Sequence, residues 1–184
     1  MYSLGAFGLL ASLVSTSLAA PAGLEEQAST PISSITPSQW AALNQSAGGR
    51  LAMGYPLAKP CYSFYKGQPV TPHTAQCAAV QNGYTDELYI ASQYGGYMNT
   101  NWAFCQAKGH ECSLDFNLPS DATYYAPPAS CYQGSVPSYY INVQQVSDVQ
   151  AGLAFAQKYG VPLAIKNSGH DYKGRSSAPH ALAL

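Results

Sequence analysis

Residues 139–166 read YYINVQQVSDVQAGLAFAQKYGVPLAIK. Residues 139–146 alternate well enough between apolar and polar side chains to predict a strand. Three of its side chains are expected to share one face: Tyr139, Ile141 and Val143. Residues 161–166, VPLAIK, are a short apolar run, and such a run predicts a second, buried strand.

The segment between these two strands predicts an amphipathic helix. Ser147 and Gln150 have the spacing of a capping box, and Gly160 is the kind of residue that ends a helix. Apolar side chains recur at helical spacing at Val149, Leu153, Ala156 and Tyr159. The whole stretch is therefore interpreted as one strand–helix–strand unit.

A polar, glycine-bearing loop follows the second strand. Residues 166–177 read KNSGHDYKGRSS. Glycines let backbone N–H groups approach an anion and serine hydroxyls add donors, so the loop is a candidate phosphate site. It lacks the GxGxxG pattern of a dinucleotide-binding turn and the GK[ST] of a P-loop. Taken alone, His170 would more often be a hydrogen-bonded surface residue than a ligand.

Other charged or imidazole side chains have no such context. Lys173 and Arg175 in the same loop either assist a phosphate or are only solvated. Three further histidines are expected at the surface: His73, His110 and His180. The paired tyrosines at 124–125 and 139–140 are expected to pack rather than to bind sugar.

Upstream of residue 139 the periodicity is weaker. A short helix is predicted to begin with Thr36 as its N-cap and Pro37 in its first turn. Its inward-facing side chains are expected to be Trp40 and Leu43. Three further segments are interpreted as loop with short strands, as partly helical and as loop: residues 48–75, 75–94 and 95–136.

Five cysteines lie at positions 61, 77, 105, 112 and 131. None forms a CxxC pair, so no metal site is expected, and in a secreted chain they predict disulfides. Cys61 is expected to pair with Cys77, and Cys112 with either Cys105 or Cys131. Because five is odd, one cysteine is expected to be free or to pair outside this chain.

The N-terminus predicts secretion. Residues 4–14, LGAFGLLASLV, have the length of the apolar part of a signal peptide, and small residues follow, so cleavage is expected after Ala19 or Ala20. The alternative is a buried core helix. If the chain is secreted, the sequence Asn44-Gln45-Ser46 makes Asn44 an N-glycosylation acceptor.

The composition also bounds the partners. Charged residues make up only 9% of the chain and the formal net charge is −1, against roughly 25% charged residues in an average soluble domain. Charge alone therefore draws the protein neither to nucleic acid nor to an anionic membrane. We expect neither as a partner.

The loop also carries a family resemblance. Residues 165–177, IKNSGHDYKGRSS, resemble the FAD-attachment loop of the vanillyl-alcohol-oxidase (VAO)/PCMH superfamily, in the form found in secreted fungal FAD-linked oxidoreductases of the berberine-bridge-enzyme-like group. The segment before it matches as well, from Cys131 through Asp148-Val149-Gln150. The resemblance covers residues 40–184 and is strongest from 131 to 177.

The resemblance implies a cofactor and its ligands. His170 would bind the flavin 8α-methyl group covalently. Further residues would line the pyrophosphate and flavin: Asn167, Ser168, Gly169, Asp171, Gly174 and Ser176. The implied activity is oxidation of a small organic substrate by hydride transfer to FAD, with molecular oxygen as acceptor. The catalytic residues and the substrate are not implied, because the family acts on sugars, alkaloids and other secondary metabolites.

The expected fold class is α+β, with a signal peptide at 1–20. A cysteine-containing extension at 21–130, irregular and stapled by disulfides, is expected to precede the N-terminal part of a PCMH-type FAD-binding domain at 131–184. The family's remaining flavin lobe and substrate domain have no counterpart in this sequence, so we expect a truncated product that is inactive alone. The alternatives are a shortened, non-catalytic secreted paralogue that binds a partner, and a small disulfide-rich secreted effector or structural protein.

Overall fold

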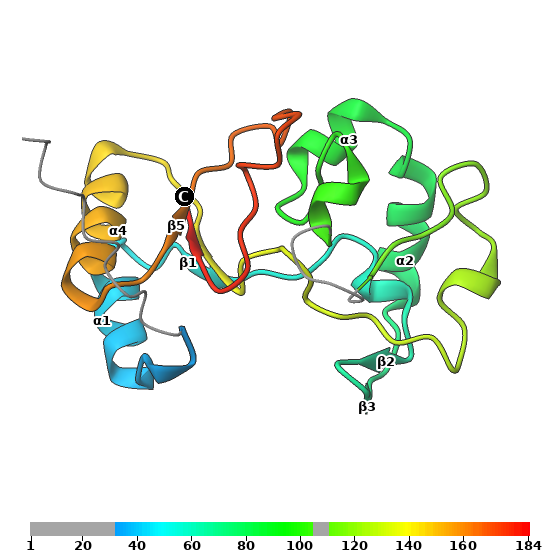
Figure 1. Cartoon of the computed structure of the whole chain (residues 1–184), viewed down its shortest axis with the longest axis horizontal. Coiled ribbons are helices and arrows are strands. Elements are labelled where there is room, and N and C mark those ends of the chain that lie inside the picture. The colour runs from blue at the N-terminus through cyan, green and yellow to red at the C-terminus, as the bar shows by residue number, and fades with distance from the viewer. Residues whose placement is uncertain (1–31, 105–110) are drawn as a thin grey trace, which may run out of the picture.

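The computed structural model describes residues 32–104 and 111–184, which form two lobes joined by extended chain (Figure 1). The helices are α1 (Pro37–Ser46), α2 (Thr74–Gly83), α3 (Glu87–Ser92) and α4 (Val146–Tyr159). The strands are β1 (Leu51–Met53), β2 (Phe64–Tyr65), β3 (Gln68–Pro69), β4 (Tyr139–Ile141), β5 (Leu163–Ala164) and β6 (Leu182–Ala183). Short 3-10 turns lie at Ile32–Ser34, Lys59–Cys61, Thr100–Ala103 and Ala122–Tyr124.

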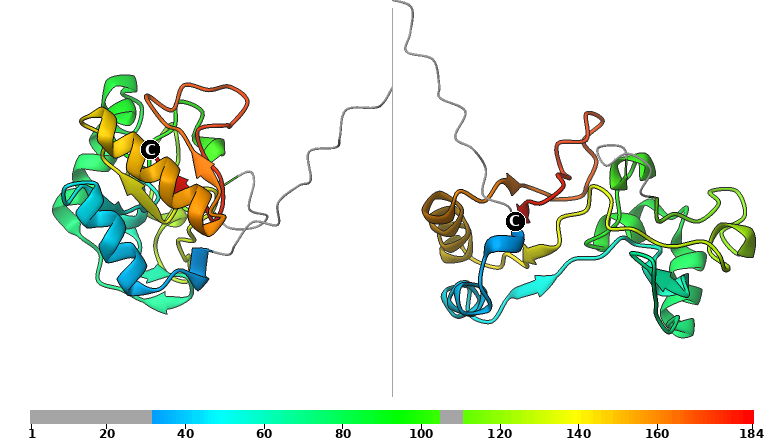
Figure 2. Two further views of the ribbon diagram at one scale, coloured as in Figure 1. Left: turned by 90° about the vertical axis from the view of Figure 1, so that its left-hand side faces the viewer. Right: turned by 60° about the horizontal axis from the view of Figure 1, so that its bottom comes forward.

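The first lobe, called the sheet lobe, contains a four-stranded sheet in the order β1-β4-β6-β5. Strands β4, β6 and β5 are parallel, and β1 runs antiparallel to β4 at the edge. Helices α1 and α4 pack side by side beside this sheet (Figure 2). The strand–helix–strand prediction is confirmed, although β6 lies between β4 and β5.

Helix α1 begins as its sequence predicts. The Thr36 hydroxyl accepts a hydrogen bond from the Gln39 amide at 3.3 Å, and the Gln39 side chain accepts one from the Thr36 amide at 2.7 Å. Trp40, on the buried face, stacks on Tyr139 of β4 and on Phe155 of α4 at centroid distances of 4.1 and 5.1 Å. This aromatic stack is the centre of the sheet lobe's core.

Helix α4 corrects two predictions. The Ser147 capping box is wrong, because the helix begins at Val146 and the Asp148 carboxylate accepts hydrogen bonds from the amides of Gln144 and Gln145 instead. The inward position of Leu153 is also wrong, since that side chain is 48% exposed. The packed face holds Gly152, Phe155 and Ala156. The predicted stop at Gly160 is confirmed by its left-handed φ of 66°.

Gly152 explains why the sheet meets this face of α4. A Cβ at this position would lie 2.5 Å from Leu184 and 3.3 Å from Ile141, so only glycine allows both side chains to pack against the helix. The strands are shorter than predicted. Val143 lies beyond β4 and is 36% exposed, which places it off the buried face expected for it.

A partly buried ion pair joins the start of β1 to α4. Arg50, the residue before β1, donates to both carboxylate oxygens of Asp148, at 2.9 and 2.5 Å, and Asp148 is fully buried. The guanidinium and the two backbone amides that face this carboxylate hold the pKa of Asp148 well below its usual range. This ion pair thereby links the chain segment before β1 to the strand–helix–strand unit.

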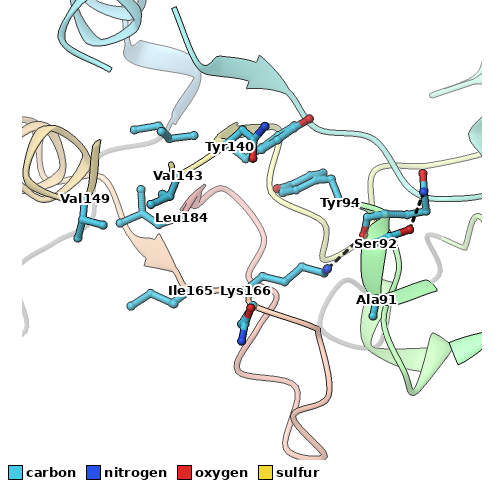
Figure 3. A pocket seen from close by; sticks show the side chains of 13 residues that line it. Ala91, Ser92, Tyr94, Tyr140, Val143, Val149, Ile165, Lys166 and Leu184 are labelled. Carbon is cyan, nitrogen blue, oxygen red and sulfur yellow. Dashed lines mark hydrogen bonds between the residues drawn. The ribbon is translucent and has the colours of Figure 1, made fainter. Parts of the chain in front are cut away.

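Tyrosines connect the two lobes. Tyr94, just after α3, stacks on Tyr140 of β4 at 3.8 Å (Figure 3). Its hydroxyl also donates a hydrogen bond to the Pro137 carbonyl at 2.9 Å. Gly54 lies against the same ring, where a Cβ would be 2.2 Å from Tyr94. Burial raises the pKa of the Tyr94 hydroxyl, so it remains a neutral donor at physiological pH.

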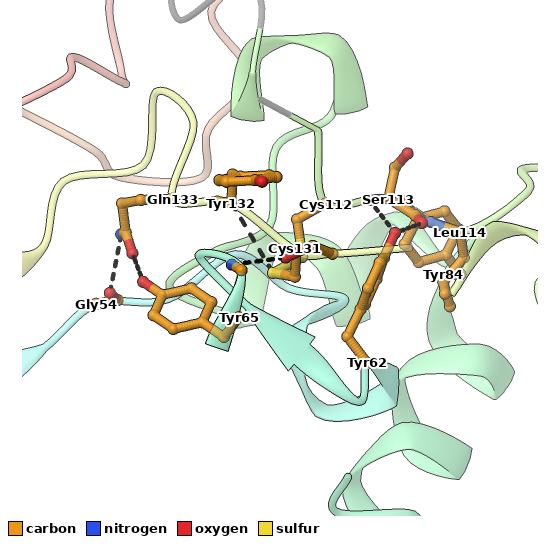
Figure 4. Close-up of a disulfide and its surroundings, with 12 residues drawn as sticks. Gly54, Tyr62, Tyr65, Tyr84, Cys112, Ser113, Leu114, Cys131, Tyr132 and Gln133 are labelled. Atoms are coloured by element: carbon orange, nitrogen blue, oxygen red, sulfur yellow. Dashed lines mark hydrogen bonds between the residues drawn. A yellow bond between two sulfur atoms is a disulfide. The ribbon is translucent and has the colours of Figure 1, made fainter. Parts of the chain in front are cut away.

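The second lobe, called the disulfide lobe, holds α2, α3 and the β2–β3 hairpin around two disulfides. Cys61 pairs with Cys77 as predicted, and Cys112 pairs with Cys131, one of its two predicted partners (Figure 4). The Tyr62 hydroxyl donates to the Ser113 carbonyl at 2.7 Å, and burial raises the pKa of Tyr62 to about 12. Covalent links and tyrosine hydrogen bonds thus hold a lobe that has little sheet.

Some expectations fall outside the described residues: the signal peptide at 1–20, and Cys105 and His110. Among the described residues no helix has the length and apolar character to cross a membrane. In the same part of the chain, His, Cys, Asp and Glu form no cluster able to hold a metal ion.

Candidate functional site

A pocket of about 560 Å³ lies at the carboxyl ends of β4, β6 and β5 (Figure 3). The pocket is lined by residues in β4 and after the three strands, by the end of α3 with the two residues after it, and by one residue of α4: Ala91, Ser92, Gln93, Tyr94, Tyr140, Ile141, Asn142, Val143, Val149, Ile165, Lys166, Asn167 and Leu184. In open α/β sheets this edge is where ligands bind, because the connecting loops diverge there. The glycine-bearing loop leaves the same edge directly after β5.

The first half of this loop is held close to the disulfide lobe. Lys166 donates its amide hydrogen to the Leu184 carbonyl at 2.8 Å, which extends the pairing of β5 with β6. The Gly169 carbonyl accepts from the Met98 amide at 3.3 Å. Gly169 has φ 77°, and a Cβ there would lie 3.0 Å from the Gly96 carbonyl oxygen. Both its conformation and its close approach therefore require glycine.

The second half of the loop packs on Trp102. A Cβ on Gly174 would lie 2.6 Å from the indole ring, and Gly174 also has a positive φ of 75°. The Ser177 hydroxyl donates to the Trp102 carbonyl at 2.8 Å. Residues 96–102 of the disulfide lobe thus contact both halves of the loop. The path of the loop therefore depends on both lobes.

Asp171 stabilises the loop through hydrogen bonds with Arg175, which lies in the same loop. The Arg175 amide and guanidinium donate to its carboxylate, with the shortest contacts at 2.5 and 2.6 Å. These donors lower the pKa of Asp171 to about 2. The carboxylate and the Arg175 charge therefore satisfy each other, and Asp171 can face a ligand chiefly through its backbone.

The remaining predicted site residues keep their side chains free. His170 is exposed, and its ring lies 5.1 Å from that of Tyr172. Asn167 is exposed and lines the pocket, whereas Ser168 and Ser176 are half-buried. None of these four side chains hydrogen-bonds to another described residue, so each is available to a ligand.

Lys166 is a site residue that the sequence reasoning missed. Its side chain crosses the pocket and its ammonium donates to the Gln93 carbonyl at 3.1 Å. The position immediately after a buried parallel strand was the available signal, since such positions face the binding edge of the sheet. Two buried donors also lie near the loop: Tyr97 Oη and Trp102 Nε1 have no hydrogen-bond partner among the described residues.

Comparison with known proteins gives a consistent result. FAD-linked oxidoreductase ffsJ of Aspergillus flavipes is 40% identical over 146 residues, which are 79% of this chain and 24% of that protein. FAD-linked oxidoreductase cheF of Chaetomium globosum is 38% identical over 151 residues, 81% of this chain and 24% of that protein. The crystal structure of the VAO-type flavoprotein MtVAO615 from Myceliophthora thermophila matches with a TM-score of 0.63 and 30% identity.

The chain is similar to VAO-type FAD-linked oxidoreductases over about four fifths of its length. The resemblance inferred from residues 165–177 and the expected α+β fold are thereby confirmed. The structural match covers 82% of this chain and 24% of the VAO-type flavoprotein. This chain thus spans about a quarter of the length of the proteins that it matches. No family model matches it.

Proposed function

We propose that this chain forms part of the FAD-binding unit of an oxidoreductase. The observation that carries the proposal is the loop at 167–177. It leaves β5 at a pocket at the carboxyl ends of three parallel strands, where Asn167 lines the pocket, and it carries His170 exposed three residues further on. The names of the similar proteins support FAD as the cofactor.

The residues present fit a flavin dinucleotide. Tyr140, Val143, Val149, Ile165 and Leu184 give the pocket apolar walls, and its volume lies within the range of small-molecule sites. Polar donors come from the loop, through the side chains of Asn167, Ser168 and Ser176 and through the backbone at Gly169 and Asp171. The Gly174 amide already donates to the Asp171 carbonyl at 3.1 Å, so Gly174 contributes through its close packing and positive φ.

His170 is proposed as the residue that attaches the flavin, through its 8α-methyl group. Its ring is exposed on a loop that both lobes hold in place, so a bound cofactor can reach it without rearrangement of the core. A covalent link would prevent loss of the cofactor in dilute surroundings. The flavin supplies hydride-acceptor chemistry, and the protein holds and orients it.

The activity of the whole protein is proposed to be oxidation of a small organic substrate, with molecular oxygen as the acceptor. We further propose that the protein is secreted, with residues 1–20 as its signal peptide and Asn44 as a glycosylated residue. The two disulfides support this location, because such bonds persist in oxidising compartments.

The proposal is tested by secretion of the chain from a fungal host. The purified protein is precipitated with acid, and flavin absorbance is recorded in the pellet and in the supernatant. We expect flavin that stays with the pellet. A folded, colourless protein, verified by circular dichroism, would contradict FAD binding by this chain alone. It would leave two alternatives, a fragment that needs the rest of the flavin lobe and a non-catalytic binding module.

A further inference from the structure

A second pocket, of about 970 Å³, lies at the amino ends of β4 and β6, opposite the candidate site. Tyr139 and Met53 line it where β4 begins and β1 ends, and His180 lies there two residues before β6. The turn between β2 and β3 reaches it from the disulfide lobe through Lys66. This second pocket shares no lining residue with the pocket at the carboxyl ends of the strands, so it is a separate site.

The body of the second pocket is apolar. Its aliphatic and aromatic lining includes Ile32, Ile35, Trp40, Met53, Tyr139 and Pro179. Met53 is 57% exposed, so a large apolar side chain of the pocket remains in contact with water. The volume lies within the range of small-molecule sites. A ligand with an apolar body would therefore gain free energy by covering these walls.

Two basic side chains line the same pocket, Lys66 and His180, and its lining contains no aspartate or glutamate. Neither side chain forms a hydrogen bond or an ion pair with a described residue. The Lys66 ammonium lies 5.2 Å from the centre of the Tyr65 ring, a contact that leaves its N–H donors unused. The pocket thus offers a positive charge and free donors beside apolar walls, which is complementary to an anion with an apolar body.

The backbone at both basic residues has a conformation that side chains rarely adopt. Lys66 has φ 52° and His180 has φ 62°, and no other non-glycine residue of the described chain has a positive φ. Lys66 and Gly67 form a two-residue hairpin turn with two positive φ values, in which asparagine is favoured at the first position.

The turn at His180 has a similar preference. The Ala181 amide donates to the Ala178 carbonyl at 3.4 Å, which places His180 at the third position of a turn where glycine or asparagine is favoured. Strained backbone of this kind is concentrated at binding sites. Both basic side chains of the pocket are therefore present against the local backbone preference, and a shared ligand gives a reason for this.

We propose that the second pocket binds a small carboxylic acid with an apolar body, either an aryl or an alkyl monocarboxylate. The Lys66 ammonium neutralises the carboxylate and the His180 ring donates to it, while the apolar body lies against Met53 and Tyr139. A neutral apolar ligand would leave the charge unpaired, and an inorganic anion would leave the walls uncovered. The inference goes beyond the proposed function and does not depend on it, because these residues take no part in the flavin site.

The test is isothermal titration calorimetry on the full chain with four probes: phenylbutyrate, decanoate, phenylbutanol and acetate. The first two distinguish an aryl from an alkyl body, phenylbutanol lacks the charge, and acetate lacks the apolar body. We expect phenylbutyrate or decanoate to bind about tenfold or more tightly than either phenylbutanol or acetate.

Two variants remove the basic side chains without adding backbone strain, Lys66→Asn and His180→Gly. Lys66→Asn should weaken carboxylate binding by about tenfold and His180→Gly by about threefold, and neither should change phenylbutanol binding. Neither unfolding temperature should fall, because asparagine and glycine suit a positive φ. The control Lys158→Gln removes a lysine of α4 outside the pocket and should leave binding unchanged.

The outcomes decide the proposal. Carboxylates that bind wild type and Lys66→Asn equally, or that bind neither protein, overturn it. Phenylbutanol that binds as tightly as phenylbutyrate also overturns it, because the pocket would then be a purely apolar groove. A chain that binds a carboxylate through Lys66 but retains no flavin upholds the second pocket and contradicts the flavin proposal alone. Circular dichroism of each variant verifies that the fold is intact.

Discussion

The two lobes are stabilised in different ways. The sheet lobe buries a continuous apolar core in which Trp40, Tyr139 and Phe155 stack between helices and sheet. Among its described residues the disulfide lobe has only a two-stranded hairpin and short helices, and its core is built around Cys131 and buried tyrosines such as Tyr84. The loop at 167–177 begins in the first lobe and rests on the second, so the site depends on both kinds of stabilisation.

The comparison predicts the largest loss of stability for a core truncation in the sheet lobe. Trp40→Ala removes the ring that joins α1 to β4 and α4, and we expect a loss of about 3–5 kcal/mol in the free energy of unfolding. Urea unfolding followed by circular dichroism measures it. The control is Leu88→Ala on α3, where the side chain is 84% exposed and the expected change is within about 0.5 kcal/mol. Equal losses would show that no such core exists.

Removal of a disulfide tests the other lobe. The double variant Cys112→Ser/Cys131→Ser is expected to lose about 3 kcal/mol, because the cross-link restricts the unfolded chain. The bonds join residues 19 and 16 positions apart, so Cys61→Ser/Cys77→Ser should lose a similar amount. Unfolding with and without reductant measures both. A loss below about 1 kcal/mol would mean that tyrosine packing alone stabilises this lobe.

Alanine substitutions at two glycines test whether the loop packs closely on the disulfide lobe. Gly174→Ala places a methyl group against the Trp102 ring at a position with φ 75°, and we expect a loss of roughly 2–3 kcal/mol. Gly67→Ala has nearly the same φ, 74°, but no atom within 4 Å of the added Cβ, so about 1 kcal/mol of backbone strain is expected there. Thermal unfolding gives both values. Equal losses would remove the argument for close packing on Trp102.

The smallest expected effect is a dependence on pH within the sheet lobe. The folded-state pKa of Asp148 is held below its ordinary value of 3.8 by Arg50 and two backbone amides. The carboxylate therefore stabilises the fold above about pH 4, and this contribution is lost as the pH falls through the folded-state pKa. Asp148→Asn should flatten the decline of stability below about pH 4 in urea titrations. An unchanged slope would show that Asp148 does not titrate with folding.

Local signals in the sequence predicted the local structure well. Thr36 and Gly160 determine helix ends through neighbouring backbone groups, so their roles could be inferred from the adjacent sequence. The pairing of β1 with β4 joins residues 51 and 141, and no periodicity within either segment specifies it. The packed face of α4 was mistaken because a glycine, Gly152, and not a leucine, meets the sheet.

The candidate site also combines features that local sequence predicts with features that depend on contacts between distant segments. The loop and its exposed histidine could be predicted from composition and resemblance, because the motif is continuous in sequence. The support from Met98 and Trp102 could not, because these contacts join segments about 70 residues apart that only the disulfide lobe brings together. Lys166 was overlooked for a related reason, since its hydrogen-bond partner Gln93 caps α3, in a segment distant in the sequence.

The central claim is that His170 holds a covalent flavin on a loop supported by both lobes. The most direct measurement is the mass of the tryptic peptide 167–173 from the secreted protein, compared with the same peptide from His170→Ala. The account predicts that the wild-type peptide carries the mass of a bound flavin nucleotide and that the variant releases all flavin on acid precipitation. An unmodified wild-type peptide, or flavin that stays bound to the acid-precipitated variant, would contradict it.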